Sequence, residues 1–500
     1  MSLEWRAVVI RLCYRRISVD DIAGNRVYMG TAFRHRAAAA LGRERVRGNI
    51  RRAMDGLVVK RAAAFPDAAE LERLRDQGRA IRDHALSRLP ELLERLESRC
   101  TANGIRVHWA RDAAEANGII VELCRRHGTG AVLKGKSMVS EEIGLNAALA
   151  DAGIEAVETD LGELIIQLAQ EHPSHIVAPA VHKDRAEIAA LFGRHFPDQV
   201  TDAAHADIEA LTALARRIMR ERFRGIRVGL SGVNFAVAET GTLCLVENEG
   251  NGRMSTTAPD VHIAVTGIEK VIARLEHLPP LLTLLTRSAT GQPVTTYVNL
   301  ISGPRRPDER DGPREVHLVL LDNGRSRIHA DPELRETLRC IRCGACMNHC
   351  PVYVRIGGHG YGTVYPGPIG AILEPQLQGL ARQGELAEAS SLCGACAEVC
   401  PVRIPIPRLL NRLRFEHAAG RAVPGAGRPG RQRLVWRTWS VIHGSPRRYR
   451  WMAVAAGVLR GLLRGPLAGL LGPWTRTRTA PVVAPRSLHD LARREGFCDD

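Results

Sequence analysis

Aromatic side chains are scarce in this chain, and long apolar runs are absent. Phe, Trp and Tyr together make up 4% of the 500 residues, although hydrophobic residues as a whole reach 45%. A protein that stacks bases on interleaved aromatic rings is therefore disfavoured, and we expect no nucleic-acid partner. No segment reaches the roughly 18 uninterrupted apolar residues of a membrane-spanning helix, and charges interrupt the N-terminal residues where a signal peptide would be apolar. The sequence thus predicts a cytoplasmic protein.

Two phosphate-binding motifs are also missing. No Gly-x-Gly-x-x-Gly segment follows an expected strand, and no Walker-type loop with its Lys and Ser or Thr occurs in the chain. Both motifs place backbone N–H groups around phosphates at the start of a helix. A dinucleotide or ATP site therefore has little support.

Lysine is absent from the last fifth of the chain, although arginine is abundant there. Residues 401–500 hold 19 Arg and 5 acidic residues, which leaves +14 of the formal net charge of +16 in this segment. Such a tail attracts nucleic acid, anionic lipid or an acidic partner, or it simply keeps a chain end in solution. Charge alone favours the last of these interpretations.

Cysteine, by contrast, is concentrated. Seven of the twelve Cys residues lie between positions 340 and 400, in a chain too long and too charged at its start for a secreted disulfide scaffold. The first motif is Cys340-x2-Cys343-x2-Cys346-x3-Cys350-Pro351. Thiolates at this spacing wrap around one iron–sulfur cluster, and the fourth cysteine of the motif serves the other cluster of a pair. A second motif is therefore expected.

The second motif, Cys393-x2-Cys396-x3-Cys400-Pro401, has Ser390 at the position of its first cysteine. Exchange of the last cysteines between motifs assigns to the first cluster four ligands, Cys340, Cys343, Cys346 and Cys400. The second cluster then receives Cys350, Cys393 and Cys396. Its fourth ligand is Ser390, another side chain or solvent, unless this cluster is a three-iron form. We expect two clusters, the first of the 4Fe–4S type.

A zinc site is the alternative interpretation of these cysteines. Zinc takes four ligands, commonly as two Cys-x2-Cys pairs, and would leave three of the seven cysteines unused. The repeated Cys-Pro ending also has no role in a zinc ribbon. The spacing favours iron–sulfur clusters strongly. Helical patterns at 367–390 and 406–417 indicate a helical two-cluster ferredoxin. The glycine-rich segment 355–368 is either a covering loop or a docking or cluster-tuning surface around His359 and Tyr361, and its composition favours neither.

Residues 100–300 predict an α/β domain with a largely parallel sheet, because short apolar runs alternate with amphipathic helical segments. The expected strands are 105–110, 130–135, 154–160, 175–180, 226–232, 241–247 and 261–267. Polar segments follow several of them, at 134–146, 231–251 and 255–267, and ligands collect at the carboxyl ends of parallel strands. Cys244 lies in an apolar strand and is interpreted as a core residue.

The expected organisation has five parts. Residues 1–28 are disordered or precede the true start at Met29, and residues 29–99 form a helical N-terminal region. The α/β domain spans 100–325, the two-cluster domain spans 331–417, and a basic C-terminal extension spans 434–500. Within the extension, residues 436–474 mix apolar runs with Arg, so that this segment lies on an anionic membrane surface or packs on another subunit. We favour a subunit contact.

The motifs "KGKSMVSEEIGLN", "VNFAVAETGTL", "TAPDVHIAVTGIEKV" and the two cysteine segments with "GGHGYGTVYPGPIGAIL" between them resemble the lactate-utilisation iron–sulfur proteins, type B. The resemblance covers roughly residues 30–480. It implies a lactate-utilisation domain with a fold similar to the NagB/RpiA/CoA-transferase group, followed by a helical two-cluster 4Fe–4S module. It also implies L-lactate oxidation to pyruvate with partner subunits of types A and C.

The resemblance supplies no catalytic residues, so the substrate contacts are inferred from chemistry. For a small carboxylate we expect a pocket lined by Lys134, Lys136, Glu141, Glu239 and Asn248. Oxidation of the α-carbon normally needs a flavin or nicotinamide cofactor, for which the chain offers no clear site. We therefore expect an electron-transfer subunit of an oxidoreductase complex, with an unknown acceptor and a peripheral quinone contact as one option. The alternatives are a redox- or metabolite-sensing iron–sulfur regulator and a transferase, which would gain nothing from two clusters.

Overall fold

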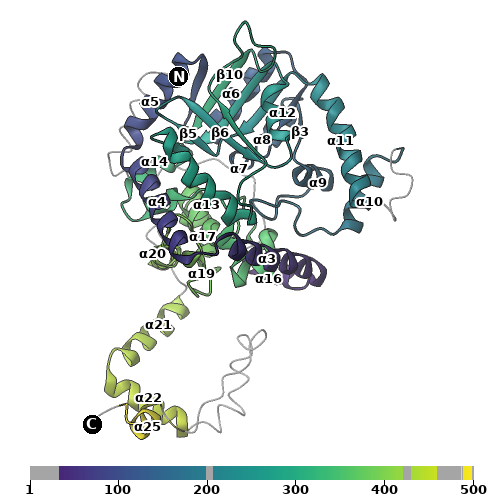
Figure 1. The fold of residues 1–500 in the computed structure, drawn as a ribbon. Coiled ribbons are helices and arrows are strands. Elements are labelled where there is room, and N and C mark those ends of the chain that lie inside the picture. The colour runs from purple at the N-terminus through teal and green to yellow at the C-terminus, as the bar shows by residue number, and fades with distance from the viewer. Residues whose placement is uncertain (1–32, 199–206, 420–429, 459–485, 487, 498–500) are drawn as a thin grey trace. The chain divides into compact units, whose positions relative to one another are not determined.

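The computed structural model describes residues 33–198, 207–419, 430–458, 486 and 488–497 (Figure 1). The predicted segment 1–28 and the apolar part of the extension at 459–485 lie outside these residues. The chain divides into two compact units, one essentially residues 33–417 and the other the C-terminal helices. The larger unit holds both the α/β domain and the cysteine motifs.

A six-stranded parallel sheet forms the centre of the α/β domain. Its order is β1-β10-β7-β4-β2-β3, and its strands are β1 (Ile105–Ala110), β2 (Ala131–Lys134), β3 (Glu155–Glu158), β4 (Val228–Gly232), β7 (Val261–Gly267) and β10 (Glu315–Leu321). Both faces are covered, one by helices and the other by a second sheet together with α5 (Leu89–Ala102), so the central strands are continuous apolar runs. β10 follows the Pro- and Arg-rich segment 303–315 and still enters the centre of the sheet, paired on both sides.

A second sheet packs against the first through one continuous core. Its order is β8-β5-β6-β9, with β5 (Phe235–Val237), β6 (Thr242–Glu247), β8 (Val271–Ile272) and β9 (Tyr297–Ile301). β5 and β6 form an antiparallel hairpin, and β9 continues antiparallel beside β6. The core between the sheets includes Leu243, Leu318 and Leu320, together with residues of α5 (Leu89–Ala102).

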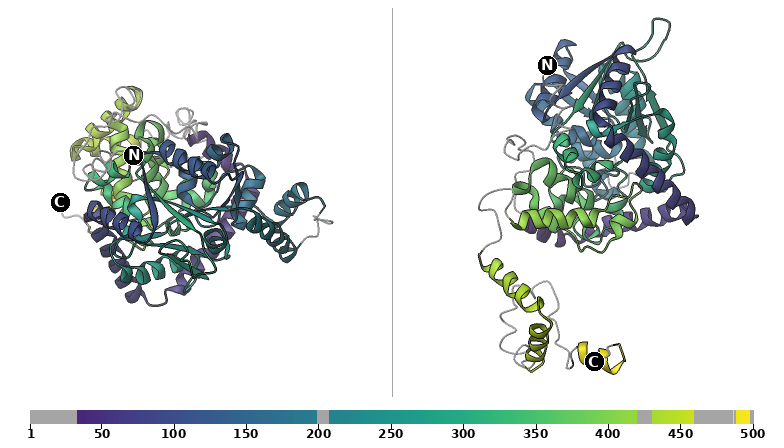
Figure 2. Two further views of the ribbon diagram at one scale, coloured as in Figure 1. Left: turned by 90° about the horizontal axis from the view of Figure 1, so that it is seen from above. Right: turned by 90° about the vertical axis from the view of Figure 1, so that its left-hand side faces the viewer.

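Helices complete the α/β domain on the other face of the parallel sheet. These are α6 (Ala113–Arg126), α7 (Met138–Glu142), α8 (Leu145–Asp151) and α12 (Asn251–Thr257). A separate small core joins α9 (Leu161–Ala169), α10 (Arg185–His195) and α11 (Ile208–Gly225), and Figure 2 shows α10 and α11 projecting from one side of the domain. The predicted α/β fold class is confirmed.

The N-terminal helices and the cysteine-bearing region share one hydrophobic core. α2 (Phe33–Leu41) and α3 (Glu44–Ala64) pack on α16 (Pro351–Tyr361), and α4 (Ala68–Ser87) packs on a 3-10 turn at Leu334–Arg339. The cysteine region itself is helical, with α14 (Arg325–Ala330), α15 (Ala345–Asn348), α17 (Gly367–Gln378), α18 (Leu380–Gln383), α19 (Ala395–Glu398) and α20 (Ile406–Ala419). α13 (Leu278–Thr290) contributes apolar residues to the same core. The helical ferredoxin-type region predicted from the sequence is therefore present.

One expected strand is wrong. Residues 175–180 form a loop. Its backbone bonds to the His175 ring, which in turn contacts the cysteine region, and it does not pair with a neighbouring strand among the described residues. The His175 ring accepts hydrogen bonds from the backbone of Val177 and Ala178, and its other nitrogen contacts Asn348 at 2.9 Å. Pro179 also removes one backbone donor that a central strand would need.

The glycine-rich segment 355–368 is not a surface loop. Its first half, residues 355–361, belongs to α16, with a break at Gly357, where φ is 64° and ψ is 177°. Gly358 is required by close packing, because a Cβ on it would lie 1.9 Å from the backbone oxygen of Ser174. The tyrosines of this segment are fully buried. Its interpretation as a covering loop is therefore corrected.

The C-terminal unit contains α21 (Gly430–His443), α22 (Pro446–Val458) and α25 (Leu488–Arg494). Several of its large apolar side chains are exposed, among them Trp436, Trp439 and Trp451. Among the described residues, no helix is both long enough and apolar enough to cross a membrane.

Candidate metal centre

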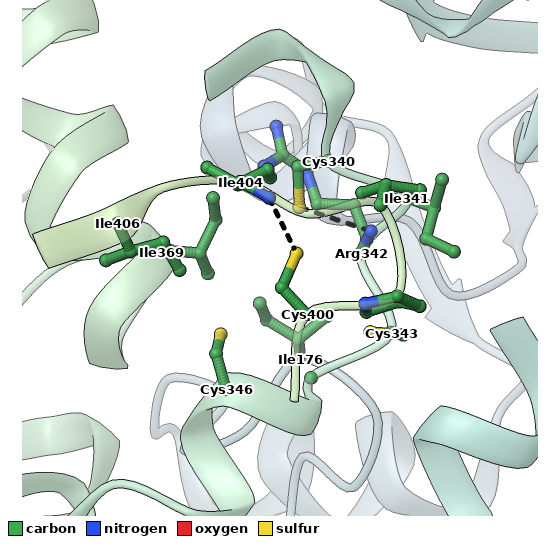
Figure 3. Close-up of a pocket in the computed structure, with 13 residues that line it drawn as sticks. Ile176, Cys340, Ile341, Arg342, Cys343, Cys346, Ile369, Cys400, Ile404 and Ile406 are labelled. Atoms are coloured by element: carbon green, nitrogen blue, oxygen red, sulfur yellow. Dashed lines mark hydrogen bonds between the residues drawn. The ribbon is translucent and has the colours of Figure 1, made fainter. Parts of the chain in front are cut away.

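Four cysteines converge on one cavity in the helical region (Figure 3). They are the four predicted for the first cluster, Cys340, Cys343, Cys346 and Cys400. The rest of the lining is mostly apolar and comes from separate segments, including Ile369 on α17, Ile404 before α20 and Ile176 in the loop of the α/β domain. The structure thus brings the last cysteine of the second motif to the first three cysteines of the first motif.

Local backbone geometry aims these sulfur atoms at the cavity. Arg342 and Gly344 adopt left-handed conformations, with φ of 62° and 77°, so the chain turns sharply between successive cysteines. Backbone N–H groups also point at the sulfurs: Arg342 N donates to Cys340 Sγ at 3.4 Å, and Ile404 N donates to Cys400 Sγ at 3.3 Å. Such N–H···S bonds stabilise the thiolate form and are a known determinant of cluster potential.

The donor set fits an iron–sulfur cluster. Burial, together with neighbouring cysteines, raises the pKa of Cys343 to about 12 and that of Cys400 to about 11. Four thiolates crowded in an apolar cavity need a cationic core to offset their mutual repulsion. Cysteine spacing, apolar lining and N–H donors all match a cubane cluster at this position.

The remaining three cysteines form a second group. Cys350 is buried at the start of α16, where its sulfur accepts from Tyr353 N at 3.5 Å. In addition to the effect of burial, Cys393 lies close enough to raise the pKa of Cys350, and Cys350 lies close enough to raise the pKa of Cys396. Cys393 is exposed. Ser390 is half-buried, and its hydroxyl accepts from Leu392 N at 3.1 Å. The three thiols predicted for the second cluster are therefore brought together.

Tyr361 adds a buried hydroxyl next to the second group. The ring lies beside Cys350 and is 0% exposed. Burial raises the pKa of both Cys350 and Tyr361, and a hydrogen bond from the Tyr361 hydroxyl toward the Cys350 sulfur lowers the pKa of Cys350 and further raises that of Tyr361. The hydroxyl has no other partner among the described residues, so it is available to donate to a thiolate at this position.

Arginines from the N-terminal helices hold the cysteine loops in place. Arg75 on α4 donates to the backbone oxygens of Cys400 and Ala397 at 3.0 and 3.1 Å. Arg82, 1% exposed, donates to the backbone oxygens of Arg339 and Leu338 just before the first motif. These side chains support both motifs without being ligands.

A buried ion-pair network joins the first motif to the α/β domain. Arg325 forms a bidentate pair with Glu142 at 2.8 and 2.7 Å and contacts Glu269 at 2.5 Å. Arg342, between the first two cysteines, lies 3.5 Å from Glu269 and stacks over the Tyr365 ring. All four charged groups are nearly inaccessible to solvent.

The polar cluster after β2 and β3 contains part of the predicted substrate pocket. Lys134 is 1% exposed and contacts Glu141 at 2.8 Å and Glu158 at 2.6 Å. Burial alone would lower the Lys134 pKa, but these carboxylates outweigh burial and raise it. Burial, followed by the charges of Glu158 and Glu141, raises the pKa of Glu163 to about 8. Lys136 donates to the backbone oxygen of Val177.

The other two predicted pocket residues are separated from each other. Glu239 precedes β6 and accepts from Leu275 N at 2.9 Å, whereas Asn248 follows β6 and contacts Gln292 at 3.1 Å. The two residues are thus at opposite ends of a six-residue strand, about 20 Å long. Asn248 is adjacent to Glu249, whose carboxylate interacts electrostatically with Lys136 and accepts from Leu161 N at 3.0 Å. Cys244, in the same strand, is 0% exposed, and burial raises its pKa to about 12, as a core residue would show.

Three family models match consecutive parts of the chain. They are the LUD domain at residues 93–321, the 4Fe-4S dicluster domain at 336–404 and the lactate utilisation protein B C-terminal model at 412–497. Lactate utilization protein B of Bacillus licheniformis is 40% identical over 92% of this chain and 95% of that protein. The chain belongs to the lactate utilization protein B family.

Other relatives agree with this assignment. Lactate utilization protein B of Bacillus subtilis is 39% identical over 94% of this chain and 96% of that protein. The uncharacterized electron transport protein YkgF of Escherichia coli is 46% identical over 76% of each chain. A crystal structure of a duf162 family protein from Deinococcus radiodurans is similar with a TM-score of 0.27 and 15% identity, covering 47% of this chain and 98% of that chain.

Sequence reasoning about this member of the protein B family missed the supporting arginines. Arg75 and Arg82 are seven positions apart on α4, with Gly78 between them facing the second Cys-Pro turn. A Cβ on Gly78 would lie 3.3 Å from the Pro401 oxygen and 2.5 Å from Leu284 Cδ1. The spacing of these residues in the sequence could have predicted their role. Two arginines that share a helix face with a glycine indicate a face that packs closely against another segment and is not exposed to solvent.

Proposed function

We propose that this chain is the electron-transfer subunit of a complex that oxidises L-lactate to pyruvate, with electrons passing through two iron–sulfur clusters. The lactate role is taken from the named relatives in the family. The observation that carries the electron-transfer role is the exchange of cysteines between the two motifs around one buried cavity. When bound, iron–sulfur clusters accept and release single electrons.

The cysteine exchange supports a conduit. Cys346 lies in the short helix α15 and Cys350 follows two residues after that helix ends, yet the two cysteines belong to different groups. Cys396 and Cys400 are related in the same way by α19. Each group is therefore only about one helical turn of chain from the other at two places, which favours electron exchange between them.

We propose that the oxidation step takes place elsewhere in the complex, and the charge balance of the α/β domain supports this. Glu141, Glu158 and Glu163 surround Lys134, and the Lys134 ammonium is already paired on two sides. An anionic substrate such as lactate would meet more carboxyl groups than ammonium groups there. We propose that partner subunits of the A and C types complete the oxidation step, and that this chain works in the reducing cytoplasm where free thiols persist.

The C-terminal unit is proposed to contact one of those partners. α21 and α22 expose Trp436, Trp439 and Trp451, with 48%, 52% and 76% of each residue accessible. Exposed aromatic residues on basic helices fit a protein interface, where tryptophan and arginine are enriched. A peripheral membrane contact near a quinone pool is the other possible docking site.

Anaerobic iron and sulfide analysis with EPR tests the proposal. The full chain is measured before and after L-lactate is added together with the partner subunits. About eight irons per chain, or seven with a three-iron signal, and lactate-dependent reduction would support it. Zinc in place of iron would contradict it. Intact clusters that lactate never reduces would instead favour a redox-sensing regulator.

A further inference from the structure

A cluster of histidines lies at the opposite edge of the parallel sheet from the polar groups after β2 and β3. Glu315 and His317 lie at the start of β10. His127 directly follows α6, which packs against β1 and β10 (Figure 1). Their ligand atoms all lie within 4.8 Å of one another. We propose that these three side chains bind a divalent transition metal ion, with zinc as the best chemical match.

The spacing of the ligand atoms fits a tetrahedral ion. Glu315 Oε2 lies 3.5 Å from His317 Nε2 and 3.8 Å from His127 Nε2. Zinc–ligand bonds of about 2.0–2.1 Å require neighbouring ligand atoms to be about 3.3–3.4 Å apart. The two distances to the carboxylate are within about half an ångström of this value, and the ligand atoms of the two histidines lie within 4.8 Å of each other. The carboxylate is 31% and His127 22% exposed, so water can occupy a fourth position.

Neither ligand nitrogen has a close partner other than the Glu315 carboxylate. His317 is 0% exposed, and its Nε2 and the buried Nε2 of His127 make no hydrogen bond of normal geometry among the described residues. Their neighbour in both cases is Glu315 Oε2, at 3.5 and 3.8 Å. A buried polar atom without a partner costs free energy, which a metal bond would offset.

A second ring orients the buried ligand. His317 Nδ1 lies 3.0 Å from His108 Nε2 on the neighbouring strand, and the two rings are stacked. If His317 Nδ1 carries the proton and donates it to His108, the lone pair of Nε2 faces Glu315 and His127. Zinc-binding histidines typically donate their other N–H in this way.

One cation competes for the same carboxylate. Arg106 donates to Glu315 Oε2, the oxygen that faces both histidines. Its side chain is 58% exposed, so it can move to Oε1 or to solvent when a metal binds. Removal of Arg106 should therefore strengthen metal binding, whereas removal of a ligand should abolish it.

A second histidine group illustrates the difference. Glu171, His182 and His359 are similarly close, but Glu171 already accepts from His182 at 2.7 Å and from Lys183 at 2.7 Å. His359 contacts the backbone oxygen of His172 through its Nε2 at 2.7 Å. These groups satisfy one another, and the lysine opposes a bound cation. We therefore assign a metal only to the Glu315 group.

The test uses the full chain with its iron–sulfur clusters intact, dialysed against a weak chelator and then loaded with zinc. Metal analysis should give about one zinc per chain, and zinc X-ray absorption should show only nitrogen and oxygen ligands. His127→Ala and Glu315→Gln should lower the bound zinc at least tenfold without changing iron content. Arg106→Ala should raise zinc affinity severalfold. His195→Ala, an exposed histidine that also ends a helix, is the matched control and should bind as the unmodified chain does.

Three results would overturn the proposal. These are zinc retained unchanged by His127→Ala and Glu315→Gln, a sulfur-containing zinc shell, and no zinc above background in chains with a full complement of iron. Because iron is counted separately in every sample, loss of the clusters is distinguished from loss of the zinc site. Circular dichroism of each variant confirms that a loss of zinc is not a loss of fold.

Discussion

The guanidinium of Arg342 lies 4.3 Å from the centroid of the Tyr365 ring, and the Tyr365 hydroxyl contacts Glu142 of the α/β domain at 2.7 Å. Arg342 also donates its backbone N–H to Cys340. Arg342 thus contacts a predicted cluster ligand through its backbone and, through Tyr365, is connected to Glu142 of the α/β domain. Because Arg342 carries a charge beside that position, it should influence the electron affinity of a bound cluster.

We expect Arg342→Gln to lower the reduction potential of the first cluster. A unit charge about 7–10 Å away changes the energy of electron addition by roughly 2 kcal/mol at an effective dielectric constant of about 20, or on the order of 50–100 mV. Glutamine also tolerates the left-handed backbone better than a β-branched residue would. Potentiometric titration followed by EPR measures the shift. Arg408→Gln, an exposed arginine of α20, is the control, and equal potentials in the two variants would contradict the prediction.

Arg325→Ala should destabilise the larger unit strongly. The substitution leaves Glu142 and Glu269 buried without their main cation, and uncompensated buried charges of this kind cost about 3–5 kcal/mol. Chemical denaturation of the reconstituted chain measures the free energy of unfolding. Arg222→Ala removes a surface pair with Glu155 at 3.0 Å and should cost no more than about 1 kcal/mol. Similar losses in both variants would show that the buried network is not a stabilising element.

The stability of the α/β domain should fall as pH rises from about 5 to 8 through Glu163. Burial and neighbouring carboxylates raise the pKa of this group to about 8 in the folded chain, above the ordinary glutamate value of about 4.3. Between these values the folded state holds a proton that the unfolded state has lost, so unfolding becomes easier at higher pH.

Glu163→Gln should remove this pH dependence. The variant should be more stable than the unmodified chain at pH 8, by about 1 kcal/mol or more, and nearly equal to it at pH 5. Urea denaturation at the two pH values measures the difference. Glu155→Gln, an exposed carboxylate on the neighbouring strand, should leave the slope unchanged. A parallel shift of Glu163→Gln at both pH values would instead indicate a loss of packing.

The sequence predicted those features that depend on local spacing. The cysteine motifs with their Cys-Pro endings placed the two thiol groups, and the apolar runs predicted most strands of the parallel sheet. The strand predicted at residues 175–180 was wrong. An apolar run does not show whether its backbone N–H groups pair with a neighbouring strand or, as here, with the His175 ring. Glu239 and Asn248 were both grouped with Lys134 because all three lie near strand ends, yet they are at opposite ends of β6, and it is the Asn248 end that carries Glu249, which interacts with Lys136. Sequence does not show which end of which sheet a residue occupies.

The supporting contacts escaped prediction for a related reason. Nothing in the sequence distinguishes Arg82 and Arg325 from surface arginines, yet each is 1% exposed. Arg82 donates to the backbone of Arg339, more than 250 positions away, and Arg325 pairs with the buried Glu142. Burial of arginine depends on partners that only the folded chain assembles. The histidines of the proposed zinc site are likewise spread over residues 127–317 without a motif.

Ser390→Cys should complete the second motif. Ser390 stands three residues before Cys393, the position at which the first motif has Cys340, and its hydroxyl now bonds only locally to Leu392 N. A thiolate there would give the second cluster a fourth cysteine and hinder the loss of one iron. Mild oxidation followed by EPR and iron analysis should show a three-iron signal in the unmodified chain and little or none in the variant. Ser391→Cys adds a thiol at the next, exposed position and should change nothing. If the unmodified chain instead keeps eight irons and Ser390→Cys has no effect, the fourth position is already filled. The buried Tyr361 hydroxyl beside Cys350 would then be the first group to test, through Tyr361→Phe.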